Sequence, residues 1–152
     1  MNIEIKNLHV YERMSEETLA FDATVYIDGV RAFSASNRGC GGCNDYEGYG
    51  KGYAKNWREL VNSAEAYAKT LPPHQSEWGE MEYDLDLILI GLIENIQWEK
   101  KLKAMCKKWV VLWDGKDPNE IEYIRMKFTP ELAPKIKAKY PKYEIVNLRY
   151  QQ

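Results

Sequence analysis

The sequence predicts an α+β domain in which a mostly antiparallel sheet packs against two main helices. Three observations lead to this expectation: an alternating hairpin near the N-terminus, two long stretches with helical spacing in the middle, and strand-like runs towards the C-terminus. The expected element order is β-β-β-α-α-β-β-α-β, and strands and helices that come in separate runs are typical of α+β folds. A chain of 152 residues fits one domain, which we expect to span residues 1–152.

The first three elements are expected to be strands. Residues 3–10 indicate a first strand with an irregularity near Asn7. In residues 19–27 apolar and polar side chains alternate, which is the pattern of a half-buried strand. Asp28-Gly29 accepts the positive φ angles of a type I′ turn, so residues 30–36 are expected to return as the partner strand.

Two helices are expected in the middle of the chain. Apolar residues recur at three- and four-residue spacing in residues 53–71, and Pro72-Pro73 ends that helix. Residues 84–108 predict a longer helix, with acidic residues early and lysines late, an order that complements the helix dipole. Residues 74–83, between the helices, are expected to be a polar, acidic loop.

The C-terminal third predicts two strands, a short helix and a last strand. Residues 109–113 and 121–128 have strand character and are joined by a turn-rich segment. Thr129-Pro130-Glu131 predicts a helix start, with a hydroxyl cap and a proline in the first turn. This basic helix is expected to end near residue 140, and residues 143–150 are expected to form the final strand.

Composition argues against several classes of function. The net charge of −2 gives no general attraction to nucleic acid or to anionic membranes. No apolar run reaches the roughly 18 residues of a membrane span, so we expect no membrane partner. The N-terminus resembles a strand and not a signal peptide, and the odd number of cysteines favours free thiols in a reducing cytoplasm.

The glycine-rich loop, residues 37–52, is the most distinctive segment. It holds six of the ten glycines, and we expect no regular element in it. Because glycine loses the most entropy on ordering, we expect that something outside the fold rewards the ordering of this loop. One candidate is a nucleotide, with Arg38, Lys51 and loop N–H groups around its phosphate and tyrosines stacked on its base. The other interpretation is a mobile surface loop.

Cys40-Gly41-Gly42-Cys43 has the spacing of half a zinc site or of a redox dithiol. Zinc would need further ligands from Cys106, His9 and His74, which form no second paired motif. A redox dithiol needs a thiol pKa lowered by a helix start, and the next helix begins about ten residues later. We therefore expect ordinary small residues in a tight loop and no cofactor, with Cys40 and Cys43 as the candidate ligands of a zinc-stabilised alternative.

Neither histidine lies in a recognisable catalytic arrangement, so we expect a protein that is not an enzyme. The lysines of the second helix and of the C-terminal segment, with Trp109, Tyr140 and Tyr143 nearby, leave nucleic-acid binding as an alternative. The net negative charge argues against that alternative, and a solvated helix face is the more frequent explanation of such lysines.

The aromatic residues point to a binding surface. The chain has 11 Tyr and 5 Trp but only 3 Phe, and Tyr and Trp are enriched at interfaces. We expect contact residues in the glycine-rich loop and in the acidic segment after the first helix, namely Arg38, Asn44, Tyr46, Tyr49, Lys51, Tyr53, Trp78, Glu80 and Tyr83.

Several short segments resemble a group of uncharacterised small proteins of bacteriophages and mobile elements. They are Ser15-Glu16-Glu17-Thr18, Asp28-Gly29, Gly41-Gly42-Cys43-Asn44 and Ala68-Lys69-Thr70-Leu71-Pro72. The resemblance covers the first half of the chain well and the rest loosely, and it brings no assigned activity. It implies an accessory protein in the cytoplasm of an infected bacterium.

Many such accessory proteins counter host defence by binding a defence protein or by sequestering its nucleotide signal. We therefore expect a non-enzymatic protein that binds and modulates or inhibits a host protein. A nucleotide binder, a zinc-stabilised module and a nucleic-acid-binding module are the alternatives. The sequence leaves the oligomeric state open.

Overall fold

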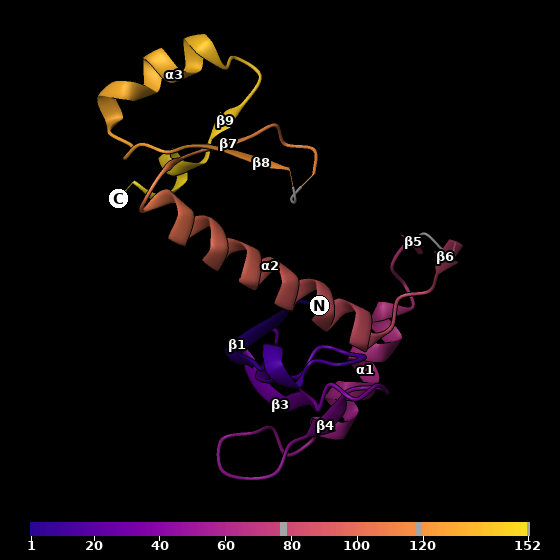
Figure 1. Ribbon diagram of the computed structural model, residues 1–152. Helices are drawn as coiled ribbons and strands as arrows, with labels where there is room; N and C mark the ends of the chain where they lie inside the picture. Colours follow the sequence, from indigo (N-terminus) through magenta and orange to yellow (C-terminus); the bar gives the residue numbers. More distant parts are fainter. Residues whose placement is uncertain (77–78, 118–119, 152) are drawn as a thin grey trace. The chain divides into compact units, whose positions relative to one another are not determined.

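The computed structural model describes residues 1–76, 79–117 and 120–151, and the chain divides into two compact units, Met1–Ile93 and Glu94–Gln152 (Figure 1). The expected α+β class is confirmed, because the described residues form antiparallel sheets and three α-helices. None of the helices in these ranges is long and apolar enough to cross a membrane. The expectation of one domain stays a prediction, because two compact units can unfold as one cooperative system.

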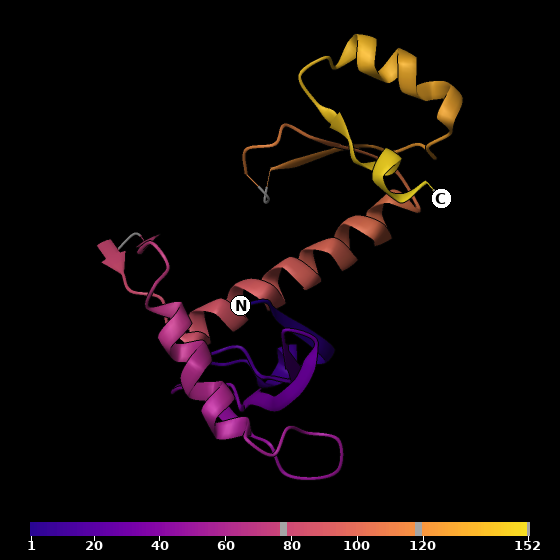
Figure 2. The same cartoon turned by 180° about the vertical axis from the view of Figure 1, so that it is seen from behind.

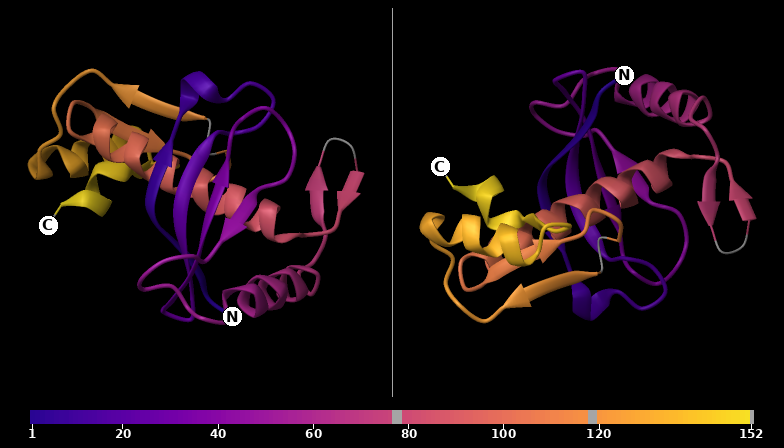
Figure 3. Two further views of the ribbon diagram at one scale, coloured as in Figure 1. Left: turned by 90° about the horizontal axis from the view of Figure 1, so that it is seen from below. Right: turned by 90° about the horizontal axis from the view of Figure 1, so that it is seen from above.

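The N-terminal unit contains a four-stranded antiparallel sheet in the order β1-β2-β3-β4 (Figure 3). Its strands are β1 (Ile3–Val10), β2 (Phe21–Ile27), β3 (Val30–Asn37) and β4 (Asp45–Glu47). A short 3₁₀ helix, η1 (Glu12–Met14), lies between β1 and β2.

Two sequence predictions about this sheet are confirmed. Asp28 and Gly29 have φ angles of 48° and 82°, as the predicted type I′ turn between β2 and β3 requires. The register of β1 shifts between Lys6 and His9, and Asn7 has a φ of 52° at this bulge. The bulge explains why the apolar positions of β1 change their spacing there.

One face of this sheet carries the core of the N-terminal unit. The helix α1 (Trp57–Ala68) and the first turns of α2 (Leu85–Cys106) pack on that face, and Figure 3 shows α2 crossing behind the strands. The opposite face carries the polar residues of the alternating pattern. The buried side chains include Phe21, Ala23, Val25 and Phe33 of the sheet and Ala64, Leu85, Leu89 and Ile93 of the helices.

Three expectations for the N-terminal unit are wrong in part. The glycine-rich loop contains a strand, β4, which is too short to show an alternating pattern. Residues 74–83 are not only loop, because β5 (His74–Ser76) and β6 (Gly79–Met81) pair as a small hairpin. The first helix begins at Trp57 and not at residue 53, because the Ala54 N–H donates to the carbonyl oxygen of Arg31 and holds this segment against β3.

The C-terminal unit is a three-stranded antiparallel sheet with a helix on each face (Figure 2). The central strand β7 (Val110–Trp113) pairs with β8 (Ile121–Ile124) and β9 (Glu144–Ile145). Val110 and Leu112 pack towards α3 (Ala133–Lys139), whereas Val111 packs with Leu102 of α2. Because helices cover both faces of this sheet, consecutive residues of β7 are buried.

The C-terminal unit also departs from the sequence predictions. Most of the expected last strand is a 3₁₀ helix, η3 (Val146–Tyr150), because the Asn147 side chain replaces backbone pairing beside β7. The Val111 N–H donates to Asn147 Oδ1 at 2.7 Å. The expected hydroxyl cap is absent: Thr129 makes no side-chain cap hydrogen bond, and the helix begins as 3₁₀ turn η2 (Pro130–Leu132).

Candidate functional site

The first half of the glycine-rich loop is held in place by the protein's own side chains. The Asn37 side-chain oxygen accepts hydrogen bonds from Thr18 Oγ1 at 2.7 Å and from the Gly39 N–H at 2.9 Å. The Asn37 side-chain nitrogen donates to Gly42 O at 3.2 Å and to Asn44 Oδ1 at 3.0 Å. The expectation that something outside the fold must order the loop is therefore wrong for residues 37–44.

Gly39 shows why this segment needs glycine. Its φ is 84°, and a Cβ atom at this position would lie 2.1 Å from the carbonyl oxygen of Met14. Its own carbonyl accepts hydrogen bonds from the N–H groups of Glu16, Glu17 and Thr18. The glycine is explained by a close approach between two backbone segments and not by a ligand.

Asn44 and Tyr46 join the sheet to α2. The Asn44 N–H donates to Asp86 Oδ2 at 3.0 Å, and the Tyr46 hydroxyl donates to Asp86 Oδ1. Burial and the neighbouring Asp86 carboxylate raise the pKa of Tyr46 far above its ordinary value. Its ring meets the Phe33 ring edge-on at 5.5 Å, so both predicted contact residues have a clear structural role.

The second half of the loop packs against the start of α1. A Cβ atom on Gly48 would lie 2.1 Å from Cγ of Trp57, so the backbone here rests directly on the indole ring. The Tyr49 ring meets the Trp57 ring edge-on, with 5.6 Å between the ring centroids. Arg58 Nη2 donates to the Tyr49 hydroxyl at 2.8 Å, and the Arg58 guanidinium carbon lies 4.5 Å from the Trp57 ring centroid.

Arg31 and Tyr53 make a second cation–π pair at the same part of the unit. The Arg31 guanidinium carbon lies 4.1 Å from the centroid of the Tyr53 ring. The Ala54 N–H donates to the carbonyl oxygen of Arg31 at 3.0 Å, which ties the end of the loop to β3. The glycine-rich loop thus brings together a set of aromatic and basic residues, which we call the aromatic–arginine surface. Its members are Arg31, Tyr49, Lys51, Tyr53, Trp57 and Arg58.

Among the aromatic residues of this surface, Tyr49 is the most exposed. Its side chain is 65% exposed although two neighbours hold it. Lys51 and Arg58 are also exposed, whereas Tyr53 and Trp57 are half-buried. The surface therefore offers an aromatic ring that is fixed beside the Arg58 guanidinium and rests on the partly buried Trp57 ring.

Arg38 does not belong to this surface. It follows the C-terminal end of β3, whereas Arg31, which lies beside Gly52, is near the N-terminal end. Seven residues of strand separate the two arginines by roughly 23 Å. Arg38 and Lys51 therefore do not come together around one phosphate in the way the sequence suggested.

The acidic segment is also separate from the aromatic–arginine surface. Glu80, on β6, accepts a hydrogen bond from Gln75 Nε2 at 2.8 Å, and the Tyr83 ring meets the His74 ring at 5.9 Å. Trp78 lies outside the described residues. The hairpin follows the C-terminal end of α1, and the aromatic–arginine surface lies at its start, about 17 Å away along the helix axis.

Cys40 and Cys43 are exposed free thiols. The Cys40 thiol lies 3.8 Å from the carbonyl oxygen of Arg38. Cys106, one of the three further zinc ligands that the sequence offered, belongs to the C-terminal unit. Among the residues that the structure describes, no three His, Cys, Asp or Glu side chains are placed to hold one metal ion.

Sequence reasoning missed three members of the surface. Arg31 lies on a strand, and Trp57 is one of the apolar residues whose spacing predicted the first helix. Arg58 follows Trp57 and is exposed. The available signal was a tryptophan–arginine pair separated by four residues from a loop rich in glycine and tyrosine.

No family model matches this chain, and no curated protein and no solved structure shows significant similarity to it. The resemblance to small phage proteins therefore stays a prediction. The geometry of the aromatic–arginine surface is the basis for a functional proposal.

Proposed function

We propose that the protein is a non-enzymatic accessory protein that binds a host protein through the aromatic–arginine surface and so modulates or inhibits it. The observation that carries the proposal is the exposed Tyr49 ring, which Trp57 and Arg58 hold in one position. Tyr, Trp and Arg are the residues in which the binding energy of protein interfaces concentrates. The resemblance to phage accessory proteins supports a partner inside an infected bacterium.

The fixed position of Tyr49 favours tight binding. A side chain that is already ordered loses little rotamer entropy when a partner covers it, and tyrosine has only two rotatable side-chain angles. The hydrogen bond from Arg58 and the edge contact with Trp57 supply this order before binding. The glycine-rich loop thus contributes a preorganised anchor, and it does not have to fold around the partner.

The charges near the surface favour a protein over a nucleic acid. Lys51 and Arg58 are exposed cations, but Asp45 and Glu47 are exposed carboxylates on the adjacent strand β4. A phosphate backbone that followed the loop onto β4 would meet these carboxylates, and like charges repel. A protein surface can place acidic residues opposite Lys51 and Arg58 and basic or polar residues opposite β4.

Co-purification from infected cells tests this proposal. The unaltered chain is compared with the double variant Tyr49→Ala/Arg58→Ala and with Tyr123→Ala as a matched control. Tyr123 is 43% exposed and stacks on Trp109 at 4.7 Å in the C-terminal unit. We expect the unaltered chain and the control to recover the same partner, and the double variant to recover at least about tenfold less.

Two results would contradict the proposal. One is that no stable partner is recovered with the unaltered chain. The other is that the double variant recovers the partner as well as the control does. Thermal unfolding of each variant establishes that a loss of partner comes from the altered surface and not from an unfolded chain.

A further inference from the structure

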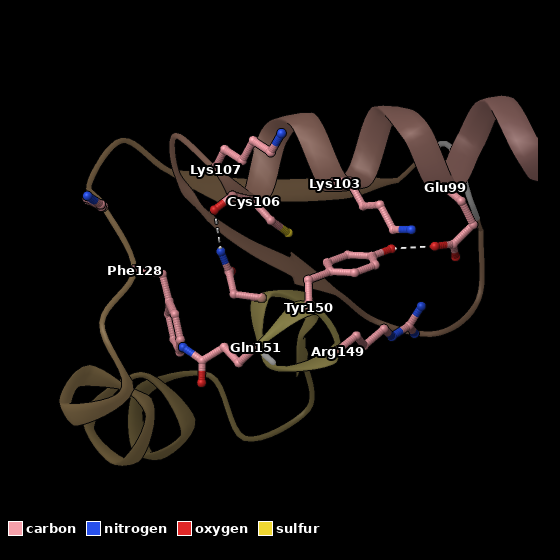
Figure 4. A pocket seen from close by; sticks show the side chains of 10 residues that line it. Glu99, Lys103, Cys106, Lys107, Phe128, Arg149, Tyr150 and Gln151 are labelled. Atoms are coloured by element: carbon pink, nitrogen blue, oxygen red, sulfur yellow. Dashed lines mark hydrogen bonds between the residues drawn. The ribbon is translucent and has the colours of Figure 1, made fainter.

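The C-terminal unit contains a pocket of about 700 Å³ (Figure 4). It lies between the last turns of α2, the segment that follows β8, and the C-terminal 3₁₀ helix η3. Sites for small molecules in proteins enclose about 300–1,000 Å³. The pocket is therefore large enough for a ligand such as a nucleotide.

The pocket is lined by four basic side chains and one carboxylate, that of Glu99. The Tyr150 hydroxyl donates to Glu99 at 2.6 Å, as Figure 4 shows. Arg149 donates two hydrogen bonds to Glu144, at 2.5 and 2.6 Å, and lies 5.1 Å from the Trp113 ring. Glu99 and Arg149 thus have partners within the protein.

The other three basic residues, Lys103, Lys107 and Lys127, form no ion pair within the part of the chain that the structure describes. Lys107 directly follows the end of α2, and its N–H donates to the carbonyl oxygen of Lys103 at 3.3 Å, so the two lysines lie one helical turn apart on the same side. Lys103 lies 5.5 Å from the centroid of the Tyr150 ring. Three cations without carboxylate partners around one pocket create a local positive potential that attracts anions.

The helix dipole explains only part of this arrangement. Lysines near the C-terminus of a helix stabilise it, and this accounts for Lys103 and Lys107. Lys127 comes from the segment after β8 and not from α2, so the dipole gives no reason for its presence. An anion in the pocket would be attracted by all three lysines.

The rest of the lining suits an apolar ring. Figure 4 shows Phe128 with Gln151 at one end of the pocket and Tyr150 with Arg149 at the other. Cys106 lies between these ends, and burial raises the pKa of its thiol to about 11. The thiol is therefore uncharged at neutral pH and does not repel an anion.

We propose that this pocket binds a nucleoside phosphate, with the phosphate against Lys103, Lys107 and Lys127 and the base against Phe128. Aromatic side chains stack on bases of any sequence. Asn147 lines the pocket but is already engaged, because its amide donates to the carbonyl oxygens of Cys106 and Trp109 and accepts from the Val111 N–H. The site is distinct from the glycine-rich loop in which the sequence suggested a nucleotide.

Isothermal titration calorimetry of the full chain tests the proposal, with adenosine diphosphate, guanosine diphosphate and inorganic phosphate as separate probes. The variants are Lys107→Gln/Lys127→Gln, which removes two charges, and Phe128→Leu, which removes a ring. Lys100→Gln/Lys135→Gln is the control, because these exposed lysines also remove two charges and lie outside the pocket lining.

We expect the diphosphates to bind at least about tenfold more tightly than inorganic phosphate, because stacking adds to the phosphate contacts. The pocket lysine variant should weaken binding by about 30-fold or more, and the control by less than about twofold. Phe128→Leu should weaken the binding of the diphosphates and leave that of phosphate unchanged.

Any of three results would overturn the proposal: no heat with either diphosphate, equal affinity for phosphate and diphosphate, or unchanged binding by the pocket lysine variant. Thermal unfolding shows whether the Phe128→Leu variant keeps its fold, and the lysine variants decide the question if it does not. The residues tested here all lie in the C-terminal unit, so the outcome is independent of the partner-capture experiment on Tyr49 and Arg58.

Discussion

The two units differ in how their sheets are covered. In the N-terminal unit α1 and α2 cover one face of a four-stranded sheet, and in the C-terminal unit α3 and α2 cover both faces of a three-stranded sheet. The sequences of the strands reflect this difference, because β2 alternates whereas Val110, Val111 and Leu112 of β7 are all buried. The pattern of apolar residues in a strand thus indicates the number of its covered faces.

The units also differ in what they offer to a partner. The N-terminal unit holds an exposed aromatic ring on its surface, a shape suited to another protein. The C-terminal unit carries an open pocket lined by basic side chains, a shape suited to a small anion. A single chain with these two features would combine two kinds of recognition, and variants of each unit separate them.

The largest expected effect tests the one-sided sheet. Phe33→Ala should lower the free energy of unfolding by about 3–5 kcal/mol, because it leaves a cavity under a fully buried ring. Ser36→Ala on the opposite face of the same strand should change it by less than about 0.5 kcal/mol. Urea denaturation measures both, and equal losses from the two variants would refute the one-sided sheet.

The second prediction tests the two-sided sheet. Leu112→Ala should cost about 2–5 kcal/mol, and its neighbour Val111→Ala should cost roughly 1.5–3 kcal/mol, because the two side chains are buried on opposite faces. The same denaturation measurement applies. A negligible cost for either of these adjacent residues would mean that one face of the C-terminal sheet is open.

The third prediction concerns the contact between the glycine-rich loop and the Trp57 ring. Gly48→Ala should lower the free energy of unfolding by about 1–3 kcal/mol, because the added methyl group collides with the Trp57 ring. Gly91→Ala is the control: it meets no atom within 4 Å and lies in α2, so it should stabilise the chain by about 0.5–1 kcal/mol. Stabilisation by both substitutions would show that the loop does not rest on Trp57.

The smallest expected effect is a pH dependence of the C-terminal unit. The hydrogen bonds from Arg149 hold the pKa of Glu144 below its usual value. The folded state therefore gains stability from this pair above the unfolded pKa of Glu144 and loses it as the pH falls through the lowered folded pKa. Because the pair is partly exposed, its contribution should stay below about 1 kcal/mol.

Comparison of the unaltered chain with Glu144→Gln checks this sign. The unaltered chain should be the more stable at neutral pH, and the difference should shrink as the pH falls through the lowered pKa of Glu144. A difference that grows on acidification would contradict the assigned pairing of Glu144 with Arg149.

Local patterns predicted much of the fold. The hairpin of β2 and β3, the bulge at Asn7 and both long helices were predicted because neighbouring residues determine them. Strand β4 was not predictable, since its three residues are ordered by distant partners, including the bond between Tyr46 and Asp86. The 3₁₀ helix η3 was missed because the Asn147 side chain acts on a strand far away in sequence.

The candidate sites were also predictable only where their residues are neighbours in the sequence. Tyr49, Lys51 and Tyr53 were expected as contact residues because they lie in one loop, whereas Arg31 joins them only through the folded sheet. The pocket was not predicted, because Lys103, Lys127 and Tyr150 come from three separate segments. Point variants test the loop more cleanly than a deletion would, because deletion of residues 39–50 would also remove β4 and its bond to Asp86.

The most direct test of the central claim is hydrogen–deuterium exchange of the chain with and without the host protein recovered by co-purification. If the partner binds the aromatic–arginine surface, it should slow exchange in residues 48–58. The exchange rates of residues 121–128 in the C-terminal unit should stay unchanged. Slower exchange confined to the C-terminal unit, with no change in residues 48–58, would contradict the account.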